Sequence, residues 1–212
     1  MAHLKFLLLL LWVGSTVCTE VDLHKRIFHN HSCEKNDHLY HVQIILSNRA
    51  HYHHLCGSSL IHREWVLTAA HCWINNVSAY VGIHPGPGRM ARIIDHKIFE
   101  NQTTKIKHDI MLLKIDPPED TIEPIDLLQC PHPKQADEVQ LAGHGCHRIN
   151  KVTKEKRMAN GDSGGGVIYD KKIYAVHVGS GKYACKFPAV SLRVCSYIDW
   201  INQTIHTKNN GK

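Results

Sequence analysis

The 212-residue sequence contains no apolar run long enough to cross a membrane. The longest run, Phe6–Val13, falls well short of the roughly 20 residues that a spanning helix needs. A basic stripe with interleaved aromatic residues is also missing, because the 25 Lys and Arg and the 19 Asp and Glu that give the net charge of +6 are scattered along the chain. These absences argue against a membrane protein and against a nucleic-acid-binding protein. No internal repeat or low-complexity segment is found, and the length allows one large domain or two small ones.

The 19 histidines do not follow the spacing of a known metal site. The densest group, His51, His53 and His54, together with His29 and His31, could bind Zn²⁺ loosely. Neither a closed structural site nor an HExxH helix is present, however. We therefore interpret these residues as exposed loop histidines, and we expect no metal ion and no cofactor.

The N-terminus has the features of a secretory signal peptide. Lys5 precedes the apolar run, and the small residues Gly14–Thr16 follow it. We expect residues 1–18 to be removed and the protein to be secreted into the extracellular space. Four Asn-X-Ser/Thr sequons fit this route, and the candidate glycosylation sites are Asn30, Asn76, Asn101 and Asn202.

Eight cysteines are consistent with an oxidising compartment. Cys18 is expected to leave with the signal peptide, so that seven cysteines remain. An odd number in a secreted chain leaves one cysteine without an intramolecular partner.

The most informative stretch is Gly161–Gly165, with the sequence GDSGG. Ser163 has glycines on its C-terminal side and Asp162 before it. Glycines let the chain turn sharply and leave backbone N–H groups open toward a developing oxyanion. Such a motif alone could also be a flexible loop.

Two other segments argue against the flexible loop. Leu67–Cys72 (LTAAHC) supplies His71, and His108–Leu113 (HDIMLL) supplies Asp109. With Ser163 they give the order His, Asp, Ser, which is that of chymotrypsin-type proteases and differs from the order in subtilisin and in the α/β-hydrolases. The chain therefore resembles the trypsin-like serine protease family. The resemblance implies a serine endopeptidase with His71, Asp109 and Ser163 as its catalytic triad.

The pattern of short apolar runs agrees with an all-β fold. Turn-forming residues separate these runs, and their even spacing is typical of a barrel or sandwich. The clearest are Tyr40–Leu46, Leu60–Ile61 with Trp65–Leu67, Ala79–Ile83, Met90–Ile94 and Ile110–Ile115. The resemblance specifies two antiparallel β-barrels with a short C-terminal helix, for which Ser196–Asp199 resembles a capping box. In that helix Ile198, Ile201 and Ile205 would share one face.

The same resemblance divides the chain and predicts how it is activated. Residues 19–26 would be a short propeptide and residues 27–212 the peptidase domain, with residues 27–125 as the first barrel and residues 126–212 as the reduced second barrel and helix. Cleavage after Arg26 would free the amino group of Ile27 to pair with Asp162 and to order the oxyanion hole. The family usually continues with Val-Gly-Gly, where this chain has Phe-His-Asn. The alternative is that the basic pair before Ile27 is an inert part of a loop.

Further site residues follow from the resemblance. The N–H groups of Gly161 and Ser163 would form the oxyanion hole. His177, Val178 and Gly179 would line the substrate pocket, where the family has Ser-Trp-Gly. The implied disulfides are Cys56–Cys72, Cys130–Cys195 and Cys33–Cys146, which leaves Cys185 free.

One region of the family is shortened in this chain. In the chymotrypsin template the His and Asp are ~45 positions apart and the Asp and Ser ~93. Here the two intervals are 38 positions, from 71 to 109, and 54 positions, from 109 to 163. The second shortfall lies between Gly145 and Gly161, where the family has two strands of the second barrel and one wall of the specificity pocket. We therefore expect a shortened C-terminal barrel with exposed strand edges.

These features leave two functions open. The first is a secreted, monomeric endopeptidase whose partners are protein or peptide substrates and protease inhibitors. The second is a catalytically impaired homologue, or a shortened isoform, that acts as a binding protein. The intact set of His71, Asp109 and Ser163 favours the first, whereas the shortened region and His177 favour the second.

Overall fold

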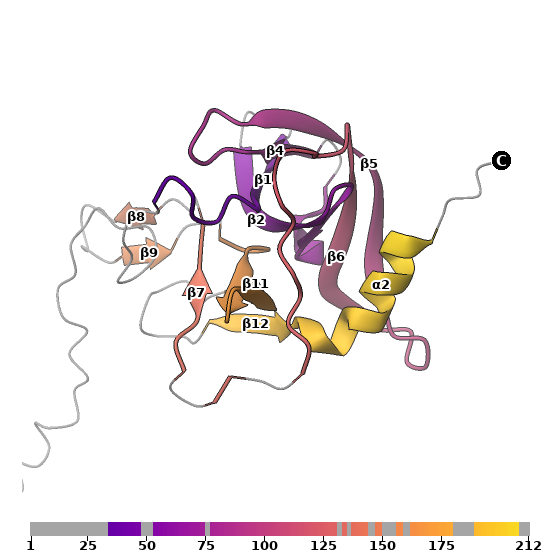
Figure 1. The fold of residues 1–212 in the computed structure, drawn as a ribbon. Coiled ribbons are helices and arrows are strands. Elements are labelled where there is room, and N and C mark those ends of the chain that lie inside the picture. Colours follow the sequence, from indigo (N-terminus) through magenta and orange to yellow (C-terminus); the bar gives the residue numbers. More distant parts are fainter. Residues whose placement is uncertain are drawn as a thin grey trace, which may run out of the picture.

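The computed structural model describes residues 34–47, 53–74, 77–130, 133–134, 137–143, 147–149, 156–158, 162–179 and 189–207. These residues form antiparallel strands, two short 3-10 helices and the C-terminal helix α2 (Figure 1). The all-β fold class is therefore confirmed.

The N-terminal half is a closed, six-stranded antiparallel barrel with the strand order β1-β2-β3-β6-β5-β4. Its strands are β1 (His41–Ser47), β2 (His53–His62), β3 (Trp65–Thr68), β4 (Val77–Val81), β5 (Arg89–Glu100) and β6 (Lys107–Asp116). All four residues of β3 are buried, and so are Ile110–Leu113 at the centre of β6. Closure leaves no free edge in this barrel, and its interior forms most of the hydrophobic core.

The predicted strands overlap the apolar runs, but β2, β5 and β6 are longer than predicted, and β4 begins and ends two residues before the predicted Ala79–Ile83. β2 begins at His53, well before the predicted Leu60–Ile61, and β5 continues to Glu100, beyond the predicted Met90–Ile94. The extra part of β2 contains Gly57, Ser58 and Ser59, which carry no apolar alternation. This part forms a strand because it pairs with β1, where the Ser58 hydroxyl also donates to the Val42 carbonyl at 2.9 Å.

The C-terminal half is a smaller, open sheet with the order β12-β11-β10-β7. Its strands are β7 (Gln140–Leu141), β10 (Gly166–Tyr169), β11 (Lys172–Gly179) and β12 (Val190–Arg193). β7 and β12 each pair with one neighbour among the described residues. The shortened second unit that the sequence predicted therefore has the form of a four-stranded sheet with two edges.

The shortened region itself contains a small hairpin. β8 (His147–Ile149) and β9 (Lys156–Met158) pair with each other and belong to neither larger sheet. The two strands that the family has in this region were expected to be missing, and the hairpin is a small element that the sequence did not predict. It is too short, at three residues a strand, to replace two strands of a barrel.

The chain ends in a 3-10 turn, η2 (Val194–Tyr197), followed by α2 (Ile198–His206). The predicted capping box is wrong, because Ser196 lies inside η2 and the N-cap residue, Tyr197, makes no side-chain capping bond. Ile198 and Ile201 are buried and Ile205 packs against the core, so the three share one face of the helix as predicted. Among the described residues no helix has both the length and the apolar character that a membrane span requires.

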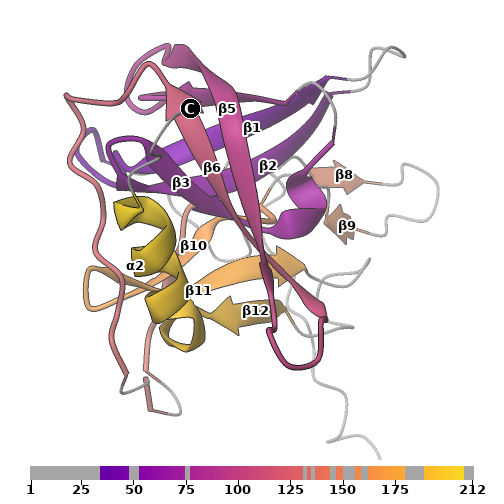
Figure 2. The same ribbon diagram turned by 90° about the vertical axis from the view of Figure 1, so that its right-hand side faces the viewer.

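Helix α2 lies beside β5 and β6 of the barrel (Figure 2). The ring of Phe99 in β5 contacts the rings of Tyr197 and Trp200 edge-on, at centroid distances of 4.9 and 5.5 Å. The Tyr197 hydroxyl is hydrogen-bonded to Nδ1 of His108, the residue before Asp109, at 2.8 Å. The helix therefore supports the start of β6, where Asp109 lies.

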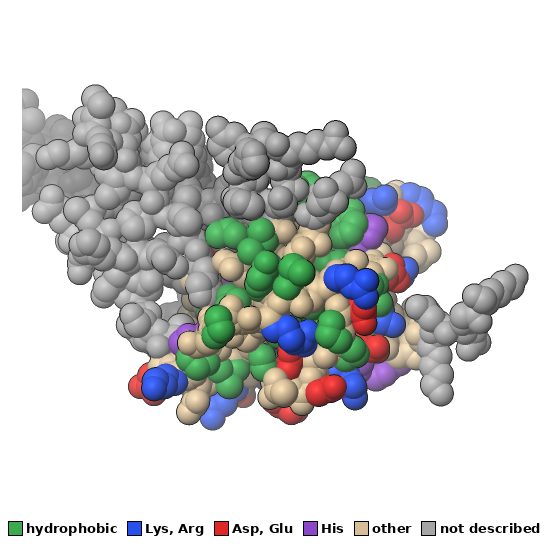
Figure 3. All heavy atoms as spheres, turned by 90° about the horizontal axis from the view of Figure 1, so that it is seen from above, with side chains coloured by type: hydrophobic (Ala, Val, Ile, Leu, Met, Phe, Trp, Pro, Cys, Tyr) green, Lys and Arg blue, Asp and Glu red, His purple; other side chains and the backbone are tan. Residues whose placement is uncertain are grey.

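A connecting segment joins the two halves. The Ile125 N–H donates to the Leu60 carbonyl, and the Leu128 N–H donates to the Ile173 carbonyl, each at 2.9 Å. Cys130 is disulfide-bonded to Cys195, so the predicted pair that ties this segment to the C-terminal region is confirmed. Seen from above, basic, acidic and hydrophobic side chains are interspersed over the described part of the surface (Figure 3).

Candidate active site

Asp109 holds His71 through both of its carboxylate oxygens. His71 lies in η1 (Ala70–Cys72), the 3-10 turn that follows β3, and Asp109 lies in β6. Oδ1 of Asp109 accepts a hydrogen bond from the backbone N–H of His71, and Oδ2 accepts one from ring Nδ1, both at 2.8 Å. Because an ionised carboxylate only accepts hydrogen bonds, the ring proton lies on Nδ1 and the lone pair on Nε2. The imidazole is thereby oriented as a base.

This pair is accessible to solvent. The side chain of His71 is 44% exposed and that of Asp109 is 37% exposed. Water therefore screens the charge of Asp109 more than in a closed site, and the carboxylate acts on His71 mainly through its two hydrogen bonds.

Ser163 lies in a tight turn that requires glycine at the next position. The N–H of Gly165 donates to the carbonyl of Asp162 at 3.1 Å. Gly164 has a φ of +87°, a left-handed conformation that L side chains rarely adopt. A Cβ at Gly164 would also overlap the Gly57 carbonyl oxygen and Oγ1 of Thr68.

Three backbone hydrogen bonds connect this turn to both halves of the molecule. On the barrel side, the N–H of Gly57 in β2 donates to the Ser163 carbonyl at 2.8 Å. On the other side, the Gly164 N–H donates to the His177 carbonyl at 2.6 Å, and the His177 N–H donates to the Gly165 carbonyl at 2.9 Å. Ser163 therefore lies at the junction of the barrel and the second sheet.

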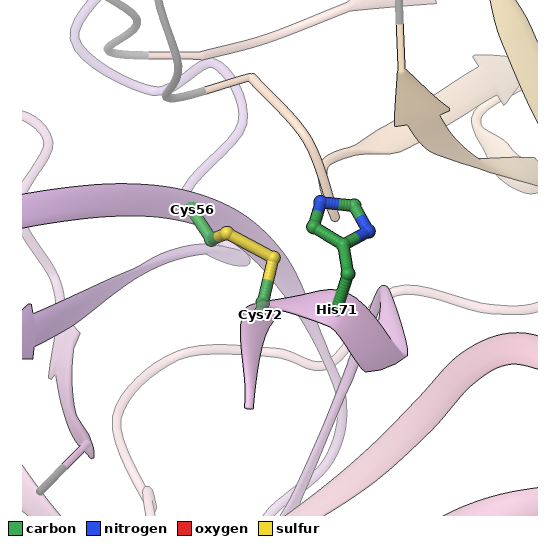
Figure 4. A group of neighbouring side chains, drawn as sticks. All are labelled: Cys56, His71 and Cys72. Atoms are coloured by element: carbon green, nitrogen blue, oxygen red, sulfur yellow. A yellow bond between two sulfur atoms is a disulfide. The ribbon is translucent and has the colours of Figure 1, made fainter. Parts of the chain in front are cut away.

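The disulfide Cys56–Cys72 brings η1 to the same junction (Figure 4). This confirms the predicted pair, and Sγ of Cys72, the neighbour of His71, lies 3.7 Å from the Ser163 carbonyl oxygen. Both sulfur atoms lie within 4.8 Å of a His71 ring nitrogen. Because the sulfurs are joined to each other, they are not thiolates, and these three residues do not form a three-ligand metal site.

The hydrogen bonds of the described residues do not include one between Ser163 Oγ and the His71 ring. Hydrogen bonds between catalytic groups are often long in proteins without substrate and tighten only when substrate is bound. The structure thus brings the backbone of Ser163 beside the η1 turn without a direct bond between the two functional side chains.

His177 is buried behind this site, with 3% of its surface exposed. It lies in β11 opposite Ser191 of β12, whose Oγ is 3.5 Å from His177 Nδ1. Burial, and secondly the charge of His71, lower the pKa of His177 below its ordinary value. The next two residues, Val178 and Gly179, are partly exposed, and a Cβ at Gly179 would meet open space.

Asp162 is 6% exposed, and its carboxylate lies against Gly143. A Cβ at Gly143 would overlap Asp162 Oδ1, so only glycine leaves room for this acid. Gly143, Gly57 and Thr68 shape the site, but the sequence did not single them out. In the sequence, Gly57 directly follows Cys56, Gly143 precedes His144, and Thr68 lies within the LTAAHC motif.

Several predicted site residues lie outside the described part of the chain. They are Arg26 and Ile27 of the predicted cleavage site, Gly161 of the predicted oxyanion hole, the cysteines Cys33, Cys146 and Cys185, and the sequon residues Asn30 and Asn76. Of the other two sequon residues, Asn202 is exposed on α2. Asn101 is partly buried, and its Oδ1 accepts hydrogen bonds from the N–H groups of Thr103 and Thr104, each at 2.9 Å.

Known proteins with similar sequences are trypsins and related serine proteases. The sequence profile of the Trypsin family matches residues 27–158, which is more than half of the chain and ends before Ser163. Dog serine protease 1 is 25% identical over 250 positions, covering 95% of this chain and 99% of that protein. Xenopus laevis trypsin is 26% identical over 250 positions, with the same coverage of both chains. Because these alignments are longer than the 212 residues of this chain, the relatives contain segments that it lacks.

Solved structures show the same fold. Mouse neuropsin, a serine protease expressed in the limbic system of the brain, superimposes with a TM-score of 0.63 at 19% identity, covering 82% of this chain and 97% of neuropsin. Kallikrein-related peptidase 10 superimposes with a TM-score of 0.63 at 24% identity, covering 83% of this chain and 99% of that peptidase. The profile match, the curated relatives and the shared fold agree with the arrangement of His71 and Asp109, and the chain belongs to the trypsin-like serine protease family.

Proposed function

We propose that this protein is a secreted serine endopeptidase that hydrolyses peptide bonds through His71, Asp109 and Ser163. The observation that carries the proposal is that Asp109 accepts two hydrogen bonds from His71, one from its backbone N–H and one from ring Nδ1. A surface histidine would need neither bond, whereas a general base needs its tautomer and its orientation fixed. Membership of a peptidase family and the position of the Ser163 turn beside η1 support the same conclusion.

In the proposed reaction, Ser163 Oγ attacks the carbonyl carbon of the scissile peptide bond while Nε2 of His71 accepts its proton. His71 then transfers this proton to the leaving amine, and a water molecule repeats the sequence to release the acyl group. Asp109 stabilises the imidazolium that forms between these steps. The N–H groups of Gly161 and Ser163 would stabilise the oxyanion, at on the order of 3 kcal/mol per donor.

We further propose that cleavage after Arg26 activates the protein. The freed ammonium group of Ile27 would pair with the carboxylate of Asp162. Burial of Asp162 supports this step, because an ion pair formed away from water is screened little. The pairing would fix the residue before Ser163 and with it the direction of the oxyanion-hole N–H groups.

The remaining features of the proposal follow from the same scheme. His177, Val178 and Gly179 would line the substrate pocket at the end of β11. Signal peptide removal after residue 18, glycans on Asn30, Asn76, Asn101 and Asn202, and a Cys33–Cys146 disulfide would accompany secretion. We propose that residues 27–125 and 126–212 form the two parts of one monomeric peptidase domain, with protein substrates and protease inhibitors as partners.

A second candidate is a binding protein on the same scaffold, with little or no catalytic activity. Three observations on the described residues favour it: the four-stranded second sheet is open, a buried histidine, His177, lies behind the Ser163 turn, and Ser163 is not hydrogen-bonded to the His71 ring. The presence of all three triad residues argues against it, because a pure binder has no use for them.

Labelling by a fluorophosphonate probe separates the two candidates, since the probe reacts only with an activated serine. The full chain is treated before and after cleavage between Arg26 and Ile27, with Ser163→Ala as the control. We expect labelling of the cleaved wild-type protein and none of Ser163→Ala. A cleaved protein that unfolds cooperatively on heating yet is not labelled would overturn the endopeptidase proposal in favour of the binding protein.

A further inference from the structure

His177 differs from the exposed His71 because it is buried where β11, β12 and the Ser163 turn meet. Its side chain is 3% exposed. Its backbone carries two of the three hydrogen bonds that hold the Ser163 turn, to Gly164 and Gly165. A movement of the His177 backbone would therefore disturb the turn.

The surroundings of His177 favour a neutral imidazole. No carboxylate is hydrogen-bonded to it within the described residues, and its one side-chain contact of this kind is Ser191 Oγ at 3.5 Å. An imidazolium at this position would lose most of its hydration without gaining an ion pair.

Among the described residues of the adjoining elements, no carboxylate is a cause of the pKa shift of His177. Asp109 of β6 is hydrogen-bonded to His71, Asp162 lies against Gly143, and Arg193 is exposed on β12. His71 of η1 is the group whose charge bears on His177, and it disfavours a second cation.

We propose that His177 is a positioning residue for His71 and Ser163, and that a proton on His177 switches the site off. While His177 is neutral its ring stays buried and its backbone holds the Ser163 turn on β11. When it takes up a proton, the buried charge is driven toward solvent, which separates β11 from Gly164 and Gly165. The effect on catalysis rests on the proposed function. The electrostatic coupling between His71 and His177 is independent of that function.

The pH dependence of probe labelling tests the switch. Activity that is lost when a single proton is taken up falls about tenfold for each pH unit at the acid end of the profile. If protons on His71 and on His177 both stop the reaction, the labelling rate of the wild-type chain at the acid end should fall about a hundredfold for each pH unit. His177→Gln, which cannot take up a proton, should return to a tenfold fall, and His177→Ser should behave in the same way if the glutamine variant does not fold.

A matched control is His62→Gln. His62 lies at the end of β2, away from the Ser163 turn, and its pKa is also lowered, mainly by burial. This variant should keep the hundredfold dependence. Circular dichroism at each pH must show that the protein remains folded. A tenfold dependence in the folded wild type, or a hundredfold dependence in His177→Gln, would overturn the proposal.

An NMR titration of the histidine ring carbons separates this inference from the proposed function. His71 in the wild type should show a second inflection at the pH where His177 titrates, and His177→Gln should remove it. If the inflection is present but the probe never labels Ser163, the coupling stands and the peptidase function fails. If His71 shows a single inflection, the inference fails whether or not the serine is labelled.

Discussion

Asp109 performs two tasks with one carboxylate, and an amide can perform only one of them. In Asp109→Asn the amide oxygen could still accept from one N–H of His71, but the NH₂ group would face the other and favour the wrong ring tautomer. We expect the rate of probe labelling to fall by about 10⁴-fold while the protein stays folded.

The matched control is Asp95→Asn in β5, where the carboxylate contacts Lys97 and the His96 N–H and not the site. Labelling of this variant should match the wild type. A labelling rate of Asp109→Asn within tenfold of the wild type would contradict the assigned role of Asp109.

Gly164 tests the geometry of the Ser163 turn without touching its functional groups. Gly164→Ala adds a Cβ at a positive φ and places it against the Gly57 carbonyl and Thr68. Because the surrounding atoms include backbone, we expect a loss of about 2 kcal/mol or more in the free energy of unfolding. Chemical denaturation measures it, and Gly179→Ala, where the added methyl meets open space, should unfold at the wild-type denaturant concentration or above.

The site also shows what the sequence could and could not predict at this scale. His71, Asp109 and Ser163 were predicted because each lies in a motif with its own local signal. Gly57 and Gly143 were not, because their importance depends on atoms from distant segments, Ser163 and Asp162, that approach them only in the folded chain. The burial of His177 behind the Ser163 turn is likewise a tertiary property with no sequence signature.

At the scale of elements, the β5–β6 side of the barrel depends on a buried acid. Glu119, after β6, accepts hydrogen bonds from Arg89 at the start of β5 and from the backbone and side chain of Thr121. Burial acts to raise the pKa of Glu119, but hydrogen bonds from Thr121 and Arg89 outweigh it and lower the pKa. Ionised Glu119 therefore contributes fully to the free energy of unfolding above the ordinary Glu pKa of about 4.3. This contribution is lost as the pH falls below that value toward the lowered pKa of the folded state.

Glu119→Gln should consequently lower the free energy of unfolding by on the order of 2 kcal/mol at neutral pH. It should also lose less stability than the wild type between about pH 7 and about pH 2, because the group that titrates below its ordinary pKa of about 4.3 is gone. Denaturation at both pH values checks this, with exposed Glu123→Gln as the control. An acid dependence identical to that of the wild type would show that Glu119 does not contribute as inferred.

The elements were predicted most accurately where side-chain pattern and tertiary contact agree. The run Ile110–Ile115 is buried along β6 and lay where the sequence predicted a strand. The N-terminal part of β2 was missed because Gly57, Ser58 and Ser59 form a strand through pairing with β1 and not through their own preference. Ser196 predicted a helix cap but lies in η2, since the chain makes a 3-10 turn after β12 before α2 begins.

For the whole molecule, the two halves differ in how they are held together. The barrel is closed and encloses its own core, whereas the second sheet has two edges and depends on its contacts with the connecting segment and α2. The Cys130–Cys195 disulfide spans 65 positions and joins that segment to the region just before α2. Loss of a cross-link that closes a loop of this length costs about 4 kcal/mol in the chain-entropy account.

We therefore expect the double variant Cys130→Ser, Cys195→Ser to destabilise the second sheet more than the barrel. Without the cross-link, β11 and β12 can separate from the connecting segment while β3 and β6 remain enclosed, so amide exchange should speed up in β11 and β12 first. Hydrogen-exchange measurements resolve the two sets of amides within one sample. Because Gly164 and Gly165 are hydrogen-bonded to β11, probe labelling of Ser163 should be lost at the same denaturant concentration as the β11 protection. If the barrel and the sheet lose protection together, the molecule is a single cooperative unit, and the shortened second half is stabilised by the barrel rather than by its own disulfide.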